Sequence, residues 1–199
     1  MPNITANKSI HRYGEIPIPQ FTSDVPAVWS ANSGTLLSDD SPRTVYNGTD
    51  FLTVVYLEVA NEFRQVTVTA TDAGSAEDTA PLTVYGTFPT ILNWGFKRID
   101  EEAALVSLAE DGVTANVRYK NSSAVVGFEA APVNRSLIDW EEFNAFRAHH
   151  RLHLPFFLFD PVDETWHKVR FDQKRFEVER QGYNRHNFPV LMRQYAGPL

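Results

Sequence analysis

The stretch that decides the fold of this chain is Trp140-Glu-Glu-Phe-Asn-Ala-Phe-Arg-Ala-His-His-Arg-Leu-His-Leu-Pro-Phe-Phe-Leu-Phe-Asp160. Its first half repeats aromatic residues every three positions, at Trp140, Phe143 and Phe146, while charged and polar residues take the other side. This spacing predicts an amphipathic helix with an aromatic face that packs on another element. Pro155 cannot continue a helix, and the apolar run after it predicts a buried strand.

The ends of these elements are also marked. Ser136 and Asp139 have the spacing of a capping box, in which each side chain bonds the backbone N–H of the other residue. We therefore expect a helix over about residues 137–151. Residues 156–159 are apolar at both parities, which is typical of a strand in the middle of a sheet.

A second strand is predicted directly afterwards. Asp160-Pro161 has turn chemistry, and residues 166–171 then alternate between two kinds of side chain, with Lys168 and Arg170 on one side. A hairpin with the helix lying across it should result. The predicted helix–strand core consists of Trp140, Phe143, Phe146, Phe157, Phe159, Val169 and Phe171.

The composition is that of a folded protein. Of the 199 residues, 43% are hydrophobic and 13% aromatic, which is ample for hydrophobic cores. The chain has no cysteine, so disulfides and thiolate metal sites are excluded. No apolar run approaches the roughly 20 residues that a membrane span needs, and the first residues lack the pattern of a signal peptide. We expect no association with a membrane.

Charge is distributed unevenly along the chain. Residues 1–89 carry four Lys or Arg against ten Asp or Glu, a net charge of −6 out of −7 for the whole chain. This difference supports a domain boundary near Pro89. Phosphate contacts need clusters of Lys and Arg, so the acidic half is a poor nucleic-acid binder. It could border a channel through which DNA slides without sticking.

The N-terminal half is predicted to be all β. Residues 66–71 alternate apolar side chains with threonine, and residues 51–57 are rich in β-branched and aromatic side chains. Asn47-Gly48 lies between residues 44–46 and the run that starts at Phe51, which predicts a tight hairpin. Short strands separated by turn signals favour a β-sandwich.

Two motifs in this half have a family pattern. They are Pro26-Ala-Val-Trp-Ser-Ala-Asn-Ser-Gly-Thr35 and Val66-Thr-Val-Thr-Ala-Thr-Asp72. Both are similar to the bacterial and phage immunoglobulin-like repeat, in which a Trp-Ser strand precedes a Gly-Thr turn and a Thr-Val-Thr-Ala-Thr strand closes the core. The resemblance covers residues 15–88, with residues 1–14 as an N-terminal arm. It implies a sandwich core that contains Trp29, Val66 and Val68.

The C-terminal half is predicted to be an α+β domain over residues 89–199. Asp111-Gly112 and Asn121-Ser-Ser123 are turn signals, and they divide residues 104–130 into three short strands. A meander should therefore precede the helix, and further strands should follow it. We expect a mostly antiparallel sheet with one helix.

Aromatic and charged positions recur across this half. They occur in Ala115-Asn-Val-Arg118, Phe128-Glu-Ala130, Asn134-Arg-Ser136, the Trp140 helix, Phe156 to Asp160, Val169-Arg-Phe171 and Phe188-Pro-Val-Leu-Met192. The pattern resembles the minor tail proteins at the tip of long, non-contractile phage tails. That resemblance implies the fold of the lambda-type tail-tip ring protein and of tail-tube and distal-tail subunits, whose strands build a ring around the DNA channel.

The resemblance implies a function in assembly. The protein would be made in the host cytoplasm and become part of the virion tail, where a trimeric or hexameric ring links the tail tube to tip or hub proteins. DNA would pass through without specific binding. A tail connector or neck protein is the alternative position. Candidates for intersubunit contacts are Glu129, Arg135, Arg170, Arg175 and Arg193, and the competing interpretation of these arginines is a solvated face.

A metal site is a second hypothesis. His149 and His153 are four residues apart, which on a continued helix would place both imidazoles on one face, with His150 and Asp160 as further ligands. Because Leu154-Pro155 should end the helix before His153 is in register, we expect no metal. The chain also lacks a nucleophile elbow and a glycine-rich phosphate loop, so neither an enzymatic activity nor a cofactor is predicted.

A third hypothesis makes the N-terminal half a decoration or adhesin module that binds glycans on the host surface. Tyr46 and Tyr56, with the loops after Trp29 and around Asn47, could offer aromatic platforms for a sugar. A position in the sandwich core is the competing interpretation of Trp29.

Overall fold

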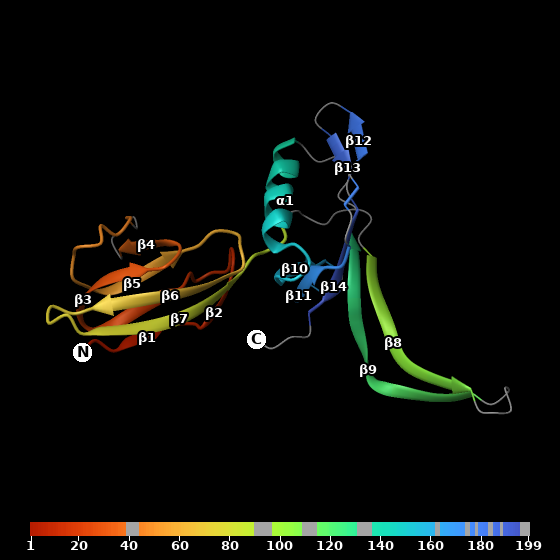
Figure 1. Ribbon diagram of the computed structural model, residues 1–199, viewed down its shortest axis with the longest axis horizontal. Helices are drawn as coiled ribbons and strands as arrows, with labels where there is room; N and C mark the ends of the chain where they lie inside the picture. The colour runs from red at the N-terminus through yellow and green to blue at the C-terminus, as the bar shows by residue number, and fades with distance from the viewer. Residues whose placement is uncertain are drawn as a thin grey trace. The chain divides into compact units, whose positions relative to one another are not determined.

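The structure is a computed structural model that describes residues 1–38, 44–89, 97–108, 115–130, 137–161, 164–173, 176–177, 179–182, 185–187 and 189–195. The side chains of residues 97–108, 115–127, 129–130, 137–139, 179–182 and 185–187 are outside this description. The described residues are mainly β with one helix, which confirms the predicted class (Figure 1). No described helix has the length and apolar character needed to cross a membrane.

The chain divides into two compact units. The first unit contains residues Met1–Phe88 together with Ala148–His150 and Leu154–Leu158. The second contains Pro89–Arg147, Arg151–His153 and Phe159–Leu199.

The first unit is built on one mixed sheet of seven strands. These are β1 (Ile4–Ala6), β2 (Ile10–Arg12), β3 (Gln20–Ala31), β4 (Thr35–Ser38), β5 (Leu52–Glu58), β6 (Arg64–Thr71) and β7 (Glu77–Tyr85). Their order is β2-β7-β6-β3-β5-β4, with β1 also on β3, and β2 runs parallel to β7. Strand β3 joins the two halves of the sheet, because residues 20–22 pair with β5 and residues 28–31 pair with β6.

One hydrophobic core fills the space between these strands. Val66, Val68 and Ala70 point inward from β6, while the residues between them face outward or are half-buried. Trp29 is buried in the same core, and its indole N–H donates to the carbonyl oxygen of Leu52 at 2.8 Å. The hydroxyl of buried Tyr46 accepts from the backbone N–H of Trp29 at 3.2 Å. Both aromatic side chains are thus held by burial and by a satisfied polar atom.

Residues 1–14 are part of this sheet and do not form the separate arm that the sequence predicts. Strand β1 pairs with β3, and β2 pairs with β7. The backbone N–H of Ile4 donates to Asp78 Oδ2 at 2.7 Å, which adds a bond from a distant strand. Strands of three residues are too short to show a period of two, so sequence patterning does not detect them.

The predicted hairpin at Asn47-Gly48 is wrong. Val45 bridges to Leu37 in β4, and β5 lies between β3 and β4, so the two segments are not partners. The Asn47 side chain accepts from the backbone N–H groups of Thr49 and Asp50 at 2.9 and 3.1 Å. This local turn uses the Asn side chain to bend the chain without pairing the flanking strands.

Gly34 forms the turn between β3 and β4. Its φ is +87°, a region that favours glycine, and a Cβ there would lie 2.7 Å from the carbonyl oxygen of Glu58. Gly48 has a similar φ of +80°, but a Cβ there would have no atom within 4 Å. A comparison of the two glycines therefore distinguishes the cost of a positive φ from the cost of steric crowding.

Gly34→Ala should destabilise the protein by about 3 kcal/mol, because it adds a backbone clash to the cost of positive φ. Gly48→Ala, the matched control, should cost about 1 kcal/mol because only the cost of φ remains. Urea unfolding of the full chain measures both changes. Equal losses in the two variants would show that the close approach at Gly34 does not constrain the fold.

His11 in β2 is a buried titratable group, 2% exposed. Its Nδ1 lies 3.7 Å from Glu15 Oε2, while Lys8 and Arg12 are the nearby cations. Burial and the charge of Lys8 together lower the pKa of His11 from 6.5 to about 4, against the opposing effect of Glu15. The folded state therefore keeps this imidazole neutral at pH values where the unfolded chain binds a proton.

Stability should fall as the pH decreases from about 6.5 to about 4, and the His11 contribution should reach up to about 3 kcal/mol. Replacing His11 by Asn should flatten this part of the profile of unfolding free energy against pH. Replacing His153, which is exposed, should leave the slope in place. A His11→Asn profile as steep as that of the unchanged protein would contradict the assignment.

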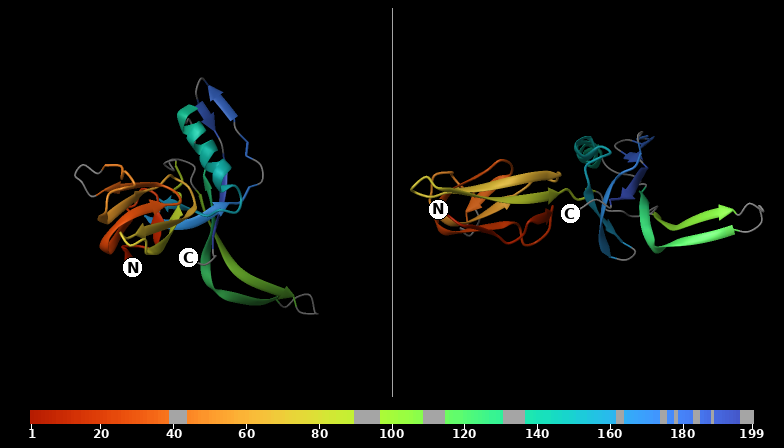
Figure 2. Two further views of the ribbon diagram at one scale, coloured as in Figure 1. Left: turned by 60° about the vertical axis from the view of Figure 1, so that its left-hand side comes forward. Right: turned by 60° about the horizontal axis from the view of Figure 1, so that its bottom comes forward.

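The second sheet has five strands in the order β10-β11-β14-β9-β8. The elements that follow β7 are β8 (Lys97–Leu108), β9 (Ala115–Ala130), α1 (Leu137–His150), β10 (Phe156–Asp160), β11 (Thr165–Phe171), β12 (Glu179–Gly182), β13 (Arg185–Asn187) and β14 (Val190–Gln194). Strands β12 and β13 pair separately. Strand β14 pairs with residues 127–130 of β9, so β8 and the rest of β9 extend beyond it as a two-stranded ribbon (Figures 1 and 2).

Strand β9 runs without interruption over the predicted turn at Asn121-Ser-Ser123, so the expected meander of three strands is wrong. Glu102 pairs with Ser123 and Ala104 pairs with Tyr119, so more residues separate the partners on β9 than on β8. The polar segment therefore makes a bulge in a continuous strand, where the sequence predicts a chain reversal. The other predicted turn, Asp111-Gly112, and the cap residue Ser136 lie outside the described residues.

Helix α1 covers one face of the second sheet. Phe143 and Phe146 are buried and meet Phe171 edge-on, with ring centroids 6.3 and 6.2 Å apart. Val169 is fully buried beside Phe171, whereas Trp140 is half-buried and contacts Phe143. The helix ends at His150, where Arg151 adopts a φ of +48° and donates its backbone N–H to the carbonyl oxygen of Arg147 at 2.8 Å.

Strand β10 is the first strand of the sheet and not a central one, which corrects the prediction from its apolar run. Phe156 and Leu158 are buried, Phe157 is half-buried, and Phe159 is 40% exposed. Phe159 therefore does not belong to the predicted core. The backbone N–H of Phe157 donates to the carbonyl oxygen of Gly86 at 2.8 Å, and both residues belong to the first unit.

Candidate functional site

The side chains of β11 divide between two faces. Val169 and Phe171 are buried, while Trp166, Lys168 and Arg170 alternate with them on the opposite side. Arg170 lies directly opposite Arg193 of β14 in the antiparallel register, so both side chains share that side.

Two further aromatic residues complete this surface. Tyr195 donates its backbone N–H to the carbonyl oxygen of Lys168, and Lys168 Nζ lies 5.0 Å from the centroid of the Tyr195 ring. Phe159 contacts Trp166, with ring centroids 5.1 Å apart. We call this surface the basic–aromatic face, and it consists of Phe159, Trp166, Lys168, Arg170, Arg193 and Tyr195.

The charge of the basic–aromatic face is mainly positive. Arg193 Nε donates to Asp172 Oδ2 at 3.0 Å, which compensates one cation. Arg170 and Arg193 nevertheless face each other across the strands, and like charges in directly opposite positions are unfavourable. Partial burial lowers the pKa of Lys168, as expected for an ammonium group that lies against a protein surface. An acidic partner would relieve this repulsion.

The same face exposes large apolar groups. Phe159 is 40% exposed and Trp166 is 39% exposed, and the two rings are in contact. Contiguous exposed aromatic residues beside arginines are typical of protein–protein contact surfaces. The geometry therefore suits recognition of a second molecule.

The predicted interface residues are only partly brought together. Arg170 and Arg193 lie on the basic–aromatic face, and the backbone of Glu129 lies opposite Leu191 on the neighbouring strand. Arg135 and Arg175 lie outside the described residues. The sequence prediction missed Trp166 and assigned Phe159 to the core, although the alternation over residues 166–171 could have identified Trp166 as a residue of the outer face.

The structure separates the two histidines of the metal hypothesis. His149 is half-buried, and its Nε2 lies 3.1 Å from the carbonyl oxygen of Phe63, while its Nδ1 lies 4.0 Å from Glu62 Oε2. His153 follows the helix end and is exposed. Within the described part of the chain, no three His, Cys, Asp or Glu residues are arranged to hold a metal ion.

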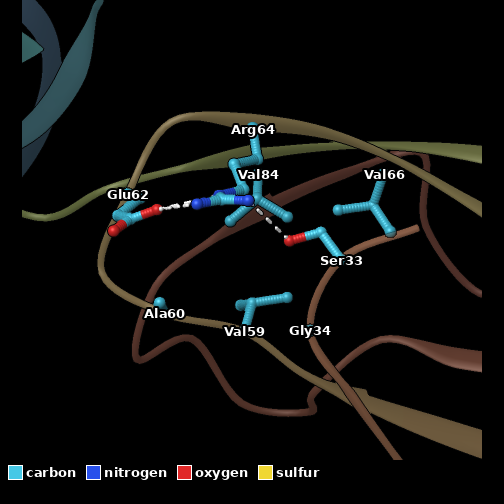
Figure 3. A pocket seen from close by; sticks show the side chains of 8 residues that line it. All are labelled: Ser33, Gly34, Val59, Ala60, Glu62, Arg64, Val66 and Val84. Carbon is cyan, nitrogen blue, oxygen red and sulfur yellow. Dashed lines mark hydrogen bonds and ion pairs between the residues drawn. The ribbon is translucent and has the colours of Figure 1, made fainter. Parts of the chain in front are cut away.

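A small cavity of about 160 Å³ lies at one end of the first unit (Figure 3). Val59, Val66 and Val84 contribute apolar side chains to it. Arg64 crosses the cavity, since its Nε donates to Glu62 Oε2 at 2.8 Å and its Nη1 donates to Ser33 Oγ at 3.1 Å. Ligand pockets usually measure about 300–1,000 Å³, and the arginine is already engaged, so this cavity suits a structural role better than a binding role.

The aromatic residues suggested as platforms for a sugar are mostly buried. Trp29 is 2% exposed and Tyr46 is 9% exposed, so neither ring can stack on a sugar. Tyr56 is half-buried in β5.

Comparison of this chain with protein-family models, with curated proteins and with solved structures found no match.

Trp166→Ala should cost about 1 kcal/mol of folding stability or less, because the ring is partly exposed. Phe171→Ala should cost about 3–5 kcal/mol, because it opens a cavity beneath α1. Urea unfolding of the full chain measures both losses. A loss for Trp166→Ala as large as that for Phe171→Ala would place Trp166 in the core and remove it from the basic–aromatic face.

Proposed function

We propose that this protein is a structural subunit of a symmetric ring at the tip of a long phage tail, where it links the tail tube to the tip proteins and surrounds the DNA channel. The observation that carries the proposal is the ribbon of β8 and β9. Over residues 97–108 and 115–126, the described pairing of each strand is only with the other. Each strand therefore has an outer edge with backbone N–H and C=O groups directed away from its partner.

Such edges favour assembly. A two-stranded ribbon is at best marginally stable in water, and exposed strand edges pair readily with strands of other chains. In a closed ring, each subunit can satisfy the edge of the next subunit, and no edge is left over. The ribbon thus supports the proposal that copies of this chain assemble through their strand edges.

The charge of the chain suits a DNA channel. Its net charge is −7, and residues 1–89 contribute −6. The remaining −1 belongs to residues 90–199, which build the ring in this proposal, so the ring has no excess of positive charge that would hold DNA phosphates. We place the first unit, as an immunoglobulin-like sandwich, outside the ring. Support comes from Trp29 in the core, from the Gly34 turn and from the inward valines of β6.

Glycan binding by the first unit has less support. Two of the aromatic residues suggested for it, Trp29 and Tyr46, are core residues. A connector or neck position, in contrast, uses the same ribbon and the same charge. The proposed position at the tip therefore rests on the family resemblance of the C-terminal half.

The purified full chain should form a closed ring with a mass of three or six times 22.5 kDa, because the ribbon edges are satisfied only between copies. Native mass spectrometry measures the stoichiometry, and negative-stain images of virions labelled with an antibody locate the protein. Label at the neck would move the ring to the connector. A protein that stays monomeric at high concentration and is absent from virions would refute the proposed function.

A further inference from the structure

The first unit carries an open groove of about 480 Å³. It is lined by Val25, Pro26, Phe51, Asp72, Ala73 and Gly74, which come from the middle of β3, from the residue before β5 and from the turn between β6 and β7. Val25 is 36% exposed and Phe51 is 49% exposed. The groove is therefore an apolar surface open to solvent.

One carboxylate, Asp72, lines this groove, and two more are chain neighbours of its lining residues. Asp24 and Asp50 are exposed and adjoin Val25 and Phe51 in the chain. Asp72 accepts backbone N–H groups from Gly74 and Ala76, and these bonds lower the pKa of its carboxyl group. The terminal amine of Met1 lies 3.2 Å from Asp72 Oδ2. Asp24 accepts from the backbone N–H of Asn3 and Asp50 accepts from the side-chain amide of Asn47, and both of these donors are neutral.

The Lys and Arg side chains that the structure describes in the first unit lie elsewhere. Arg12 pairs with Tyr85 and Arg64 pairs with Val84, at the end of β7 that is opposite the Asp72 turn. Lys8 donates to the carbonyl oxygen of Pro17 and lies 3.6 Å from Glu15 Oε1. The groove is therefore mainly apolar, and the charged side chains next to it in the chain are the carboxylates of Asp24 and Asp50.

We propose that the basic–aromatic face of one copy of this chain docks on the apolar groove of a second copy. The inference rests on the proposed ring function and adds a second intersubunit contact to the one that the ribbon edges make. Phe159 and Trp166 of one copy provide the aromatic side chains that Val25, Pro26 and Phe51 of the next copy can cover. Arg170 and Arg193 then meet Asp24 and Asp50 of that copy.

This contact explains two otherwise unfavourable features together. Arg170 gains a carboxylate partner, Arg193 gains one in addition to Asp172, and two exposed apolar surfaces are removed from water. Because the two surfaces differ, the contact is head to tail, and repetition of such a contact closes a ring when the rotation permits. Electrostatic complementarity also fixes the order of copies.

A nucleic acid is the other anionic ligand that an aromatic and basic sheet face could bind. The chain as a whole carries a net charge of −7, and residues 1–89 would repel phosphates. An acidic protein surface that also offers apolar side chains matches both components of the face, and the first unit is such a surface. The observations therefore favour a second copy.

The test is a charge exchange in the full chain. The face variant carries Arg170→Glu and Arg193→Glu, and the groove variant carries Asp24→Lys and Asp50→Lys. Each variant alone should associate at least about tenfold more weakly, because like charges now meet at the contact. An equimolar mixture of the two variants, and a single chain with all four substitutions, should associate again. Sedimentation velocity at low salt measures association.

Matched controls test whether the positions matter or only the net charge. Glu58→Lys changes the charge of an exposed residue of β5 by the same amount as Asp50→Lys, and Arg151→Glu does so for Arg193→Glu. Both controls should associate like the unchanged protein. Far-UV circular dichroism establishes that each variant is folded. If the face variant does not fold, Arg193→Gln takes its place, and if the groove variant does not fold, Asp50→Asn takes its place.

The outcomes separate this contact from the ring itself. If the unchanged protein forms rings and both charge variants still form them, the proposed contact is wrong while the ring function stands. If the unchanged protein is monomeric, the ring function fails and the contact fails with it. Fluorescence anisotropy with a single-stranded oligonucleotide tests the nucleic-acid alternative. If the unchanged protein binds the oligonucleotide and the face variant does not, the basic–aromatic face is a nucleic-acid site and the inference is overturned.

Discussion

The edge-on packing of Phe143 and Phe146 against Phe171 is the contact on which the second unit depends. It fixes which side of the second sheet lies beneath α1. Because side chains on a strand alternate, burial of Val169 and Phe171 sends Trp166, Lys168 and Arg170 to the other side. The same hydrophobic contact that stabilises the sheet thus creates the basic–aromatic face.

The first unit also divides its aromatic residues between the core and the surface. Its core takes Trp29 and Tyr46 and satisfies their polar atoms with backbone partners, which removes them from any surface role. Phe51 and Val25 remain exposed beside Asp24 and Asp50. Aromatic residues of one sequence segment therefore divide between the core and the surface.

The proposed assembly role rests on surfaces of the chain. The histidines that suggested a metal site are separated by the end of α1, where Arg151 takes a left-handed conformation. The cavity beside Arg64 is small, and its charged side chains bind each other. The ribbon of β8 and β9, the exposed sheet face and the acidic groove are all surfaces suited to other protein chains.

The sequence by itself determined the mainly β class, the single described helix and the inward side of β6 with Val66 and Val68, because periodicity and turn residues act over a few neighbouring positions. The core position of Trp29 was implied by the family resemblance. Tertiary structure decided what pairs with what. In the folded chain β10 is an edge strand and Phe159 is exposed. Residues 44–46 pair with β4, and β9 continues through Asn121. Strand partners and exposed faces depend on residues far apart in the chain, and local patterns carry no information about them.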